Sequence, residues 1–142
     1  GLKTAEKIIS SGGMAVLMDL NSEQGSANAK ELGDRALFIK TNVTSENEVQ
    51  NAVIEASNFM GGMTLAVSCA GVVGAARALG REKPMPVEFF SQTIQVNLIG
   101  SFLVSKEAAN IPEIPVFLKL VDFSDTYFLL IIPLNKLKIL KF

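Results

Sequence analysis

The first 110 residues alternate continuous apolar runs with segments whose apolar residues recur at helical spacing. Strands are predicted at Met14–Asp19, Ala36–Lys40 and Leu65–Cys69, and the first is apolar up to its final Asp19, as a strand buried on both faces should be. Helices are predicted at Thr4–Ser10, which ends near Gly12-Gly13, and at Ser22–Leu32, which Gly33 follows; glycine suits the end of a helix. This alternation indicates a parallel sheet with flanking helices, a Rossmann-like α/β fold.

Two more helices complete this pattern. One is predicted to begin at Ser45, because Ser45–Glu48 fits a capping box. A long final helix is predicted over Val87–Asn110. The apolar positions at helical spacing in these two helices are Val49, Ala52, Val53 and Ala56 in the first, and Phe90, Ile94, Leu98 and Phe102 in the second.

The pattern changes after Asn110. Residues 111–142 contain apolar clusters, three prolines and no glycine. Strands are predicted at Val116–Val121 and Phe128–Ile132, with no covering helix evident between them. We therefore divide the chain into an α/β unit, residues 1–110, and a divergent hydrophobic tail, residues 111–142.

Composition narrows the possible functions. Of the 142 residues, 49% are hydrophobic and 19% are charged, which predicts one folded domain rather than a disordered chain. A formal net charge of −1 gives no general attraction to nucleic acid or to an anionic membrane surface. The absence of histidine excludes Ser-His-Asp catalysis and histidine metal sites, and we predict no metal site. No stretch approaches the length of a membrane-spanning helix.

Asp19 is the first candidate for chemistry, because it ends a buried strand. Ligands of doubly wound sheets bind at the carboxyl ends of the strands, where an acid accepts hydrogen bonds from ribose hydroxyls. Such an acid also repels a 2′-phosphate, by roughly 1 kcal/mol in water and roughly 4 kcal/mol at partial burial, and this favours NAD over NADP. The alternative is that Asp19 only forms a turn.

The ends of the other two strands carry further candidates. Asn42-Val43 follows the second strand and could contact an adenine edge. Cys69-Ala70-Gly71 ends the third, and Gly71 permits close approach of the backbone to a ligand. Each pair or triplet alone is also compatible with an ordinary loop. Together with Asp19 they are predicted to meet at one edge of the sheet, where a dinucleotide would lie.

The order of these motifs resembles the short-chain dehydrogenase/reductase family. The matching motifs are Asp19, Asn42-Val43, SCAG at 68–71 and QVNLIGSF at 95–102. Over residues 1–109 the chain is similar to the mitochondrial type 2 3-hydroxyacyl-CoA dehydrogenase branch, also called type 10 17-beta-hydroxysteroid dehydrogenase, which shares GLKTAEKI, VLMDL and VTSENEVQNA. The resemblance implies an NAD-dependent oxidoreductase of lipid metabolism that acts on 3-hydroxyacyl-CoA or hydroxysteroid alcohols. It also implies a mitochondrial location.

The resemblance assigns roles to the strand ends. Asp19 would bind the adenosine ribose. Asn42 stands where the family usually has an aspartate that contacts adenine, and Val43 would also contact the adenine. Cys69 and Ala70 would line the cofactor ribose through their backbone groups, although Cys69 also suits a small buried position. Gly71 would keep this loop closely packed.

The resemblance also implies a role for Asn97. It matches the family's active-site asparagine, which holds a water that relays protons to the catalytic lysine. The alternative is an asparagine whose hydrogen bonds are satisfied within the helix.

Several parts of the family pattern are missing. Of the glycine-rich turn TGxxxGxG, only the last glycine is present, as Gly1, and the first strand of the sheet is absent. The catalytic YxxxK pair is missing, because the only tyrosine is Tyr127 and Ile131 stands four residues later. We therefore expect these 142 residues to have no dehydrogenase activity. The alternative is a non-catalytic α/β module that forms homo-oligomers or associates with full-length relatives.

The missing first strand has a structural consequence. In the family it lies between the strands that correspond to Met14–Asp19 and Leu65–Cys69. Its absence leaves two inner edges with unpaired backbone groups. We expect the gap to close or the tail to fill it, or else a poorly stable chain. A further interpretation is that Val116–Val121 replaces the next strand of the sheet.

Overall fold

In the computed structural model, residues 1–74, 77–78, 80, 84–111, 118–123 and 126–131 are described. The first half of the chain contains five elements in the order predicted from the sequence. They are α1 (Leu2–Ser10), β1 (Ala15–Asp19), α2 (Ser22–Leu32), β2 (Ala36–Lys40) and α3 (Glu46–Met60).

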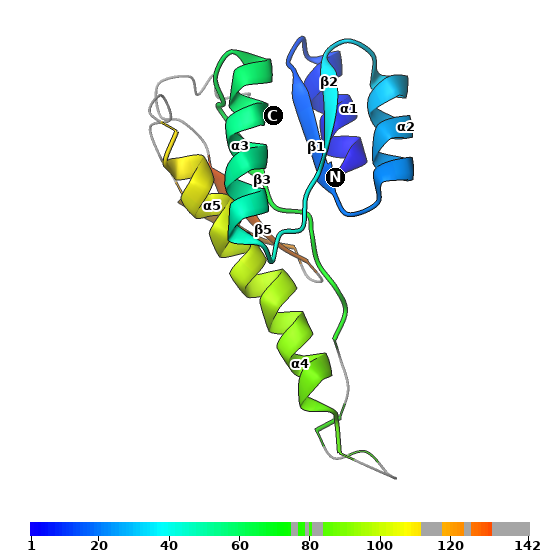
Figure 1. Ribbon diagram of the computed structural model, residues 1–142, viewed down its shortest axis with the longest axis vertical. Helices are drawn as coiled ribbons and strands as arrows, with labels where there is room; N and C mark the ends of the chain where they lie inside the picture. The colour runs from blue at the N-terminus through cyan, green and yellow to red at the C-terminus, as the bar shows by residue number, and fades with distance from the viewer. Residues whose placement is uncertain (75–76, 79, 81–83, 112–117, 124–125, 132–142) are drawn as a thin grey trace.

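The second half contains a short strand, a long interrupted helix and two strands of the tail. The elements are β3 (Ala66–Val67), α4 (Val87–Ile94), the π-helical segment η1 (Gln95–Gly100), α5 (Ser101–Ala109), β4 (Leu118–Phe123) and β5 (Thr126–Ile131). The long helix predicted over Val87–Asn110 is therefore present, but its middle turn is π-helical. Its α4 end projects beyond the rest of the molecule (Figure 1).

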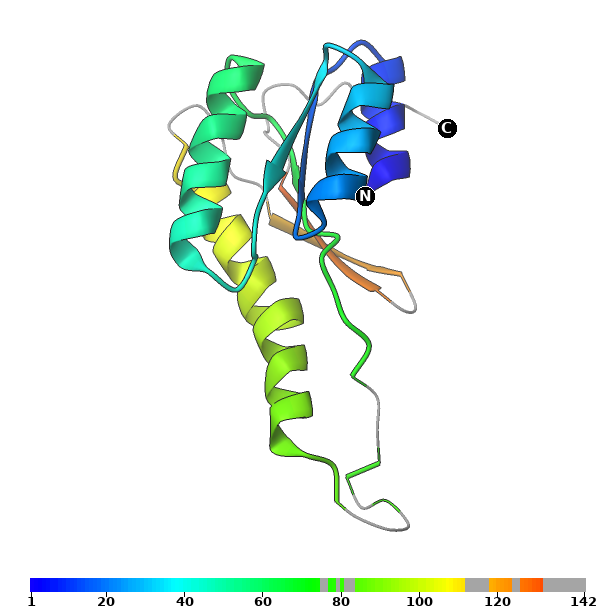
Figure 2. The same cartoon turned by 45° about the vertical axis from the view of Figure 1, so that its right-hand side comes forward.

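β1 and β2 form a parallel pair, as predicted. Ala15 lies opposite Ala36 and Asp19 lies opposite Lys40. Helices α1 and α2 lie on one side of this pair and α3 on the other (Figures 1 and 2). This is the layer arrangement of a Rossmann-type unit, and it confirms the predicted fold class.

The third strand differs from the prediction. It is shortened to Ala66–Val67 and pairs antiparallel with β5 of the tail, which in turn pairs antiparallel with β4. Among the described strands, β1 pairs with β2 only. The tail therefore supplies a partner for β3 without joining the two sheets.

The interpretation of Val116–Val121 as the next strand of the sheet is wrong for the part described. Leu118–Val121 belongs to β4, which pairs with β5, and it is β5 that pairs with β3. Residues 116, 117 and 132 of the predicted tail strands lie outside the described residues. A strand can pair with any of several free sheet edges, and its apolar pattern does not specify which edge that will be.

The core lies between α3 and the α5 end of the long helix. The four predicted α3 positions, Val49, Ala52, Val53 and Ala56, are all buried. A cluster of Val49, Val53, Met63, Leu103 and Ala108 forms the centre. Met18 from β1 and Ala66 from β3 pack against it, so both sheets share this core.

Local signals explain where the helices begin and how closely they pack. The Asn21 side chain accepts a hydrogen bond from the backbone amide of Gln24 at 3.0 Å and caps α2. Ser45 Oγ accepts from the Glu48 amide at 3.4 Å, so half of the predicted capping box is formed. Gly25 has no room for a side chain, because an added Cβ would lie 2.0 Å from the Phe38 ring. This contact lets α2 lie directly on β2.

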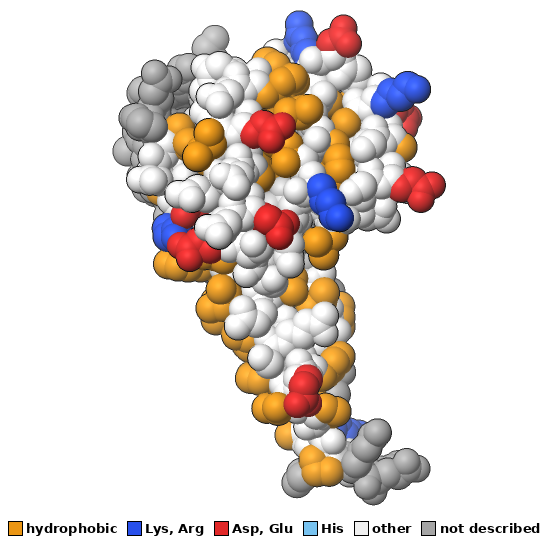
Figure 3. All heavy atoms as spheres, in the orientation of Figure 1, with side chains coloured by type: hydrophobic (Ala, Val, Ile, Leu, Met, Phe, Trp, Pro, Cys, Tyr) orange, Lys and Arg blue, Asp and Glu red, His pale blue; other side chains and the backbone are white. Residues whose placement is uncertain are grey.

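Much of the long helix, from α4 to the start of α5, carries apolar side chains that are exposed. Hydrophobic side chains gather along the projecting helix in the space-filling view (Figure 3). Phe90 is 52% exposed, Leu98 60% and Phe102 60%. None of the helices within the described residues has the length and hydropathy needed to cross a membrane.

Candidate functional site

The carboxyl ends of the three strands that follow α1, α2 and α3 face the same edge of the α/β unit, on the side from which α4 projects (Figure 1). The turn after β1, the loop after β2 and the segment after β3 all lie at this edge, and so does the N-terminus of α1 (Figure 1). An added Cβ at Gly1 would lie 3.8 Å from Cβ of Cys69, so the start of α1 adjoins the segment after β3. We call this the loop edge.

Asp19 is exposed at the end of β1. One carboxylate oxygen, Oδ1, accepts a hydrogen bond from the Asn21 amide at 2.9 Å. The turn role that the sequence left open is therefore present. It occupies one oxygen of a carboxylate, and a carboxylate has further lone pairs with which to accept hydrogen bonds from a ligand.

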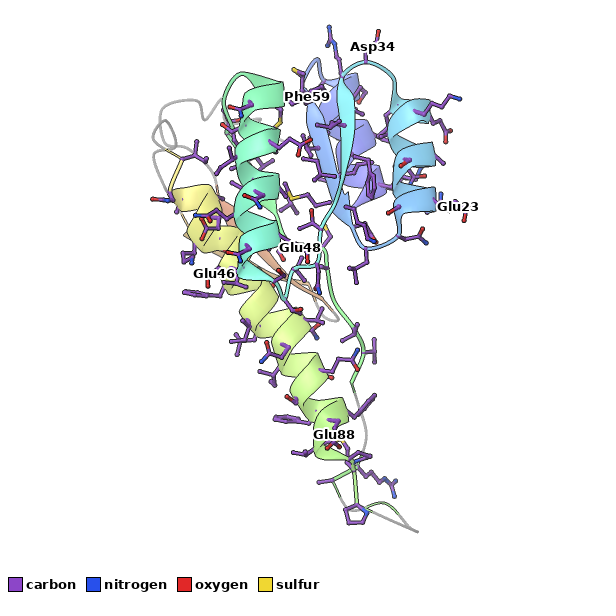
Figure 4. All side chains as sticks on the ribbon, viewed as in Figure 1. Glu23, Asp34, Glu46, Glu48, Phe59 and Glu88 are labelled. Atoms are coloured by element: carbon purple, nitrogen blue, oxygen red, sulfur yellow. The ribbon has the colours of Figure 1, made fainter. Side chains whose placement is uncertain are left out.

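The loop after β2 is held by hydrogen bonds to both the side chain and the backbone of Asn42. Asn42 Oδ1 accepts hydrogen bonds from the Thr44 amide at 3.0 Å and from the Thr44 hydroxyl at 2.8 Å. The backbone amide of Asn42 donates a hydrogen bond to Glu48 Oε2 at 2.9 Å. Glu48, labelled at the start of α3 in Figure 4, thus holds this loop and does not close the capping box.

Val43 is anchored on the long helix. An added Cβ at Gly100 would lie 2.8 Å from Cγ2 of Val43, which is closer than real contacts allow. A glycine at the end of η1 therefore provides the space that Val43 occupies. The predicted adenine loop is positioned by α3 through Glu48 and by η1 through Gly100.

The segment after β3 is anchored on the same helical turn. Asn97 Oδ1 accepts from the Val72 amide at 2.8 Å, and Asn97 Nδ2 donates to the Val72 carbonyl at 2.9 Å. An added Cβ at Gly71 would lie 3.5 Å from Asn97 Oδ1, an ordinary contact distance. An added Cβ at Gly74 would meet Thr93 Oγ1 at 1.8 Å, so the loop lies directly on α4 there.

The structure brings some of the predicted residues together and leaves others apart. Asn97 adjoins Gly71, and Val43 packs at Gly100, three residues further along the helix. The hydrogen bonds described for the side chains of Asp19 and Asn42 remain within their own turns. Cys69 is half-buried and Ala70 is exposed at the loop edge.

Sequence reasoning missed four residues that position these loops: Thr44, Glu48, Val72 and Gly100. The capping pattern identified Glu48 but assigned its side chain to the helix, not to Asn42. The glycine at position 100 lies within the motif QVNLIGSF, although nothing in the motif shows which side chain it accommodates. Val72 takes part only through its backbone amide and carbonyl, and the type of side chain gives no sign of such a role.

A second polar cluster lies away from the loop edge. Lys106 forms ion pairs with Glu46 and Glu107, and Glu107 is buried. These hydrogen bonds, first to Glu46 and then to Glu107, raise the pKa of Lys106 above its usual value. The cluster lines an open hollow of about 480 Å³ between α3 and α5. No group of three potential metal ligands occurs among the described residues.

Comparison with known proteins gives the family. The family model "short chain dehydrogenase" matches residues 1–112. The chain is 39% identical over 113 residues to 3-hydroxyacyl-CoA dehydrogenase type-2 of Rattus norvegicus, covering 78% of this chain and 43% of that protein. It is 35% identical over 113 residues to the protein of the same name from Drosophila melanogaster, covering 78% of this chain and 44% of that protein.

Solved structures agree. The crystal structure of 3-hydroxyacyl-CoA dehydrogenase type-2 from Mycobacterium avium matches with a TM-score of 0.61 and 31% identity, over 78% of this chain and 44% of that one. A Serratia marcescens short-chain dehydrogenase/reductase mutant matches with a TM-score of 0.68 at 23% identity, over 78% of this chain and 45% of that one, which supports the fold. The chain thus spans less than half the length of these relatives. The chain belongs to the short-chain dehydrogenase family.

Proposed function

We propose that the loop edge is the adenosine half of an NAD site in an oxidoreductase that acts on 3-hydroxyacyl-CoA or hydroxysteroid alcohols. Relatives named 3-hydroxyacyl-CoA dehydrogenase type-2 match most of the chain, and this supports the reaction class. The same resemblance supports a mitochondrial role in lipid metabolism. In this proposal Asn97 belongs to the proton relay, and NAD supplies hydride acceptance when it is bound.

The observation that carries the proposal is the position of Asp19 at the loop edge. The turn uses Oδ1, which orients the carboxylate and leaves it exposed toward a ligand. Asn42-Val43 and Cys69-Ala70-Gly71 flank the same edge (Figure 1). No acidic residue stands in the first turn of α1, so the residues of this turn fit a neighbouring phosphate.

Titration with NAD and NADP tests the proposal. We expect the unaltered chain to bind NAD more tightly than NADP, because the Asp19 carboxylate repels the 2′-phosphate. Asp19→Asn keeps an acceptor for the Asn21 amide but removes the charge, so it should reduce this preference by at least about fivefold. Asp34→Asn is the matched control, because Asp34 is exposed at the opposite edge (Figure 4). An unchanged preference in Asp19→Asn would contradict the role of the charge.

We further propose that these 142 residues alone do not catalyse the reaction. A catalytic Tyr and Lys four residues apart come close together on a helix, where they lie one turn apart, whereas Tyr127 lies in the extended strand β5 and the residue four positions later is Ile131. The chain mixed with NAD and 3-hydroxybutyryl-CoA should give no NADH absorbance above a blank. Turnover by the purified chain would contradict this proposal.

A second candidate function is association with an intact relative through the projecting helix. The exposure of Phe90, Leu98 and Phe102 favours it, because exposed apolar patches often mark protein–protein contacts. Size-exclusion chromatography of the chain mixed with a full-length relative should show a common peak, which Leu98→Glu removes. Leu20→Glu is the control, because Leu20 is 61% exposed in the turn after β1, away from the long helix. Separate peaks for the unaltered proteins would exclude this function.

A further inference from the structure

Three serine hydroxyls connect the end of β3 to the long helix. Ser68, one residue after β3, lies with its Oγ 3.1 Å from Oγ of Ser101. Ser101 Oγ donates to the Asn97 carbonyl at 2.7 Å, and Ser105 Oγ donates to the Ser101 carbonyl at 2.6 Å. Ser68 is 6% exposed and Ser105 9%, so the chain of hydroxyls lies mostly inside the protein.

The direction of the Ser68–Ser101 hydrogen bond follows from the single proton that each serine hydroxyl carries. A serine hydroxyl has one proton to donate, and Ser101 gives its proton to the Asn97 carbonyl. The oxygen of Ser101 must then accept from Ser68, which orients it. Loss of the Ser101 hydroxyl would leave the buried Ser68 hydroxyl without this partner, which costs more than the loss of an exposed bond.

Asn97 is held at both ends by different parts of the chain. Its backbone carbonyl, in the π-helical turn, accepts the Ser101 proton. Its side-chain amide makes both hydrogen bonds to the Val72 backbone. A serine that donates to the carbonyl four residues earlier changes the local course of a helix, and π-helical turns often occur at functional sites.

We propose that Ser101, oriented by Ser68, is a positioning residue for the segment after β3: its hydroxyl fixes the Asn97 carbonyl in the π-helical turn and thereby places the Asn97 amide on Val72. The inference rests on the proposed function where it concerns NAD, because this segment would line the cofactor ribose. Ser101 touches neither cofactor nor substrate in this proposal, and it acts through Asn97.

Hydrogen exchange of the Val72 amide in the full 142-residue chain tests the proposal directly. Ser101→Ala should speed this exchange about fivefold to tenfold, the effect of losing one net hydrogen bond. Ser68→Ala should have a smaller effect, because Ser101 can still donate to Asn97. The double variant should be no worse than Ser101→Ala alone, because both residues act through one bond. Additive effects in the double variant would contradict the proposed order.

Three other variants separate positioning from general stability. Ser101→Thr keeps a hydroxyl that can reach the same carbonyl, so it should restore slow exchange at Val72. Ser105→Ala removes a bond of the same kind one turn further on and should leave Val72 exchange unchanged. Ser91→Ala, at an exposed site on α4, should change nothing. Equal acceleration at Val72 in Ser101→Ala and Ser105→Ala would overturn the proposal.

A titration with NAD separates this inference from the proposed function. Ser101→Ala should weaken NAD binding by no more than the factor by which it speeds Val72 exchange, because only molecules with the segment in place bind NAD. If the unaltered chain does not bind NAD, the proposed function fails, while the exchange result still decides whether Ser101 positions the loop. If NAD binds equally well to both proteins although exchange differs, the link from Ser101 to the cofactor is excluded.

Discussion

The two sheets of this protein differ in how their strands pair, although each begins with a predicted strand. β1 and β2 are parallel neighbours joined through α2, with a register from Ala15–Ala36 to Asp19–Lys40. β3 pairs with β5, more than fifty residues away in sequence, and the pairing is antiparallel. The first sheet depends on a local crossover, whereas the second depends on which distant strand is available.

The sheets are joined by side chains rather than by backbone hydrogen bonds. α3 contacts β1 and β2, while α5 contacts β3 and β5, and the two helices pack on each other. The buried cluster that contains Val53 and Leu103 receives Met18 from the first sheet and Ala66 from the second. The comparison therefore predicts one shared core with two separable sheets.

Breaking the shared core should have the largest effect. Leu103→Ala removes a side chain that is 8% exposed and should destabilise the protein by about 2–4 kcal/mol. Both sheets should lose amide protection together in hydrogen exchange, because both pack on this cluster. Leu98→Ala, on the same long helix but 60% exposed, should change the free energy of unfolding little. Loss of protection in only one sheet would show that the core is not shared.

Breaking the second sheet alone is expected to have the next largest effect. Leu130 lies opposite Val67 of β3 and Lys119 of β4, so Leu130→Pro removes an amide in the middle strand of this sheet. Amide protection should fall in β3, β4 and β5 and should remain in β1 and β2. Leu130→Ala keeps the amide and serves as the control. Parallel loss in β1 and β2 would contradict the separation of the sheets.

A clash in the first sheet should give an intermediate effect. Gly25→Ala would place Cβ 2.0 Å from the Phe38 ring and should destabilise by about 1–3 kcal/mol, as overpacking does. Phe38→Leu in the same chain should restore part of this loss by making room. Urea unfolding measures both variants. If Gly25→Ala stabilises the protein, helix propensity outweighs the contact with β2.

The smallest expected effect concerns pH and the ion pairs of Lys106. Because Glu46 and Glu107 raise the pKa of Lys106, these pairs stabilise the fold fully below the usual lysine pKa of about 10.4. The stability is lost as the pH rises through the raised pKa. Thermal unfolding between pH 8 and 11 should show this decline, and Glu46→Gln should reduce its size. An identical decline in Glu46→Gln would exclude the pair with Glu46 as its cause.

The sequence predicted the first half of the fold closely because its signals are local. Asn21 and Ser45 cap α2 and α3 through their own side chains, and the apolar run of β1 ends at Asp19. It did not predict the pairing of β3 with β5, since strand pairing depends on edges that no local pattern specifies. The π-helical turn around Asn97 was also missed, because its spacing is close to that of an ordinary helix.

The residue pattern alone was enough to place the family-like motifs, in order, at the ends of the predicted strands. The contacts that hold these motifs in place follow from the packing of distant elements. Asn97 reaches Val72 across 25 residues, and Gly100 makes room for Val43 across 57, contacts that exist only once helix and loops have packed. The physical reason is that strand ends follow from local periodicity, whereas the position of a loop depends on the side chains of whichever distant element lies against it.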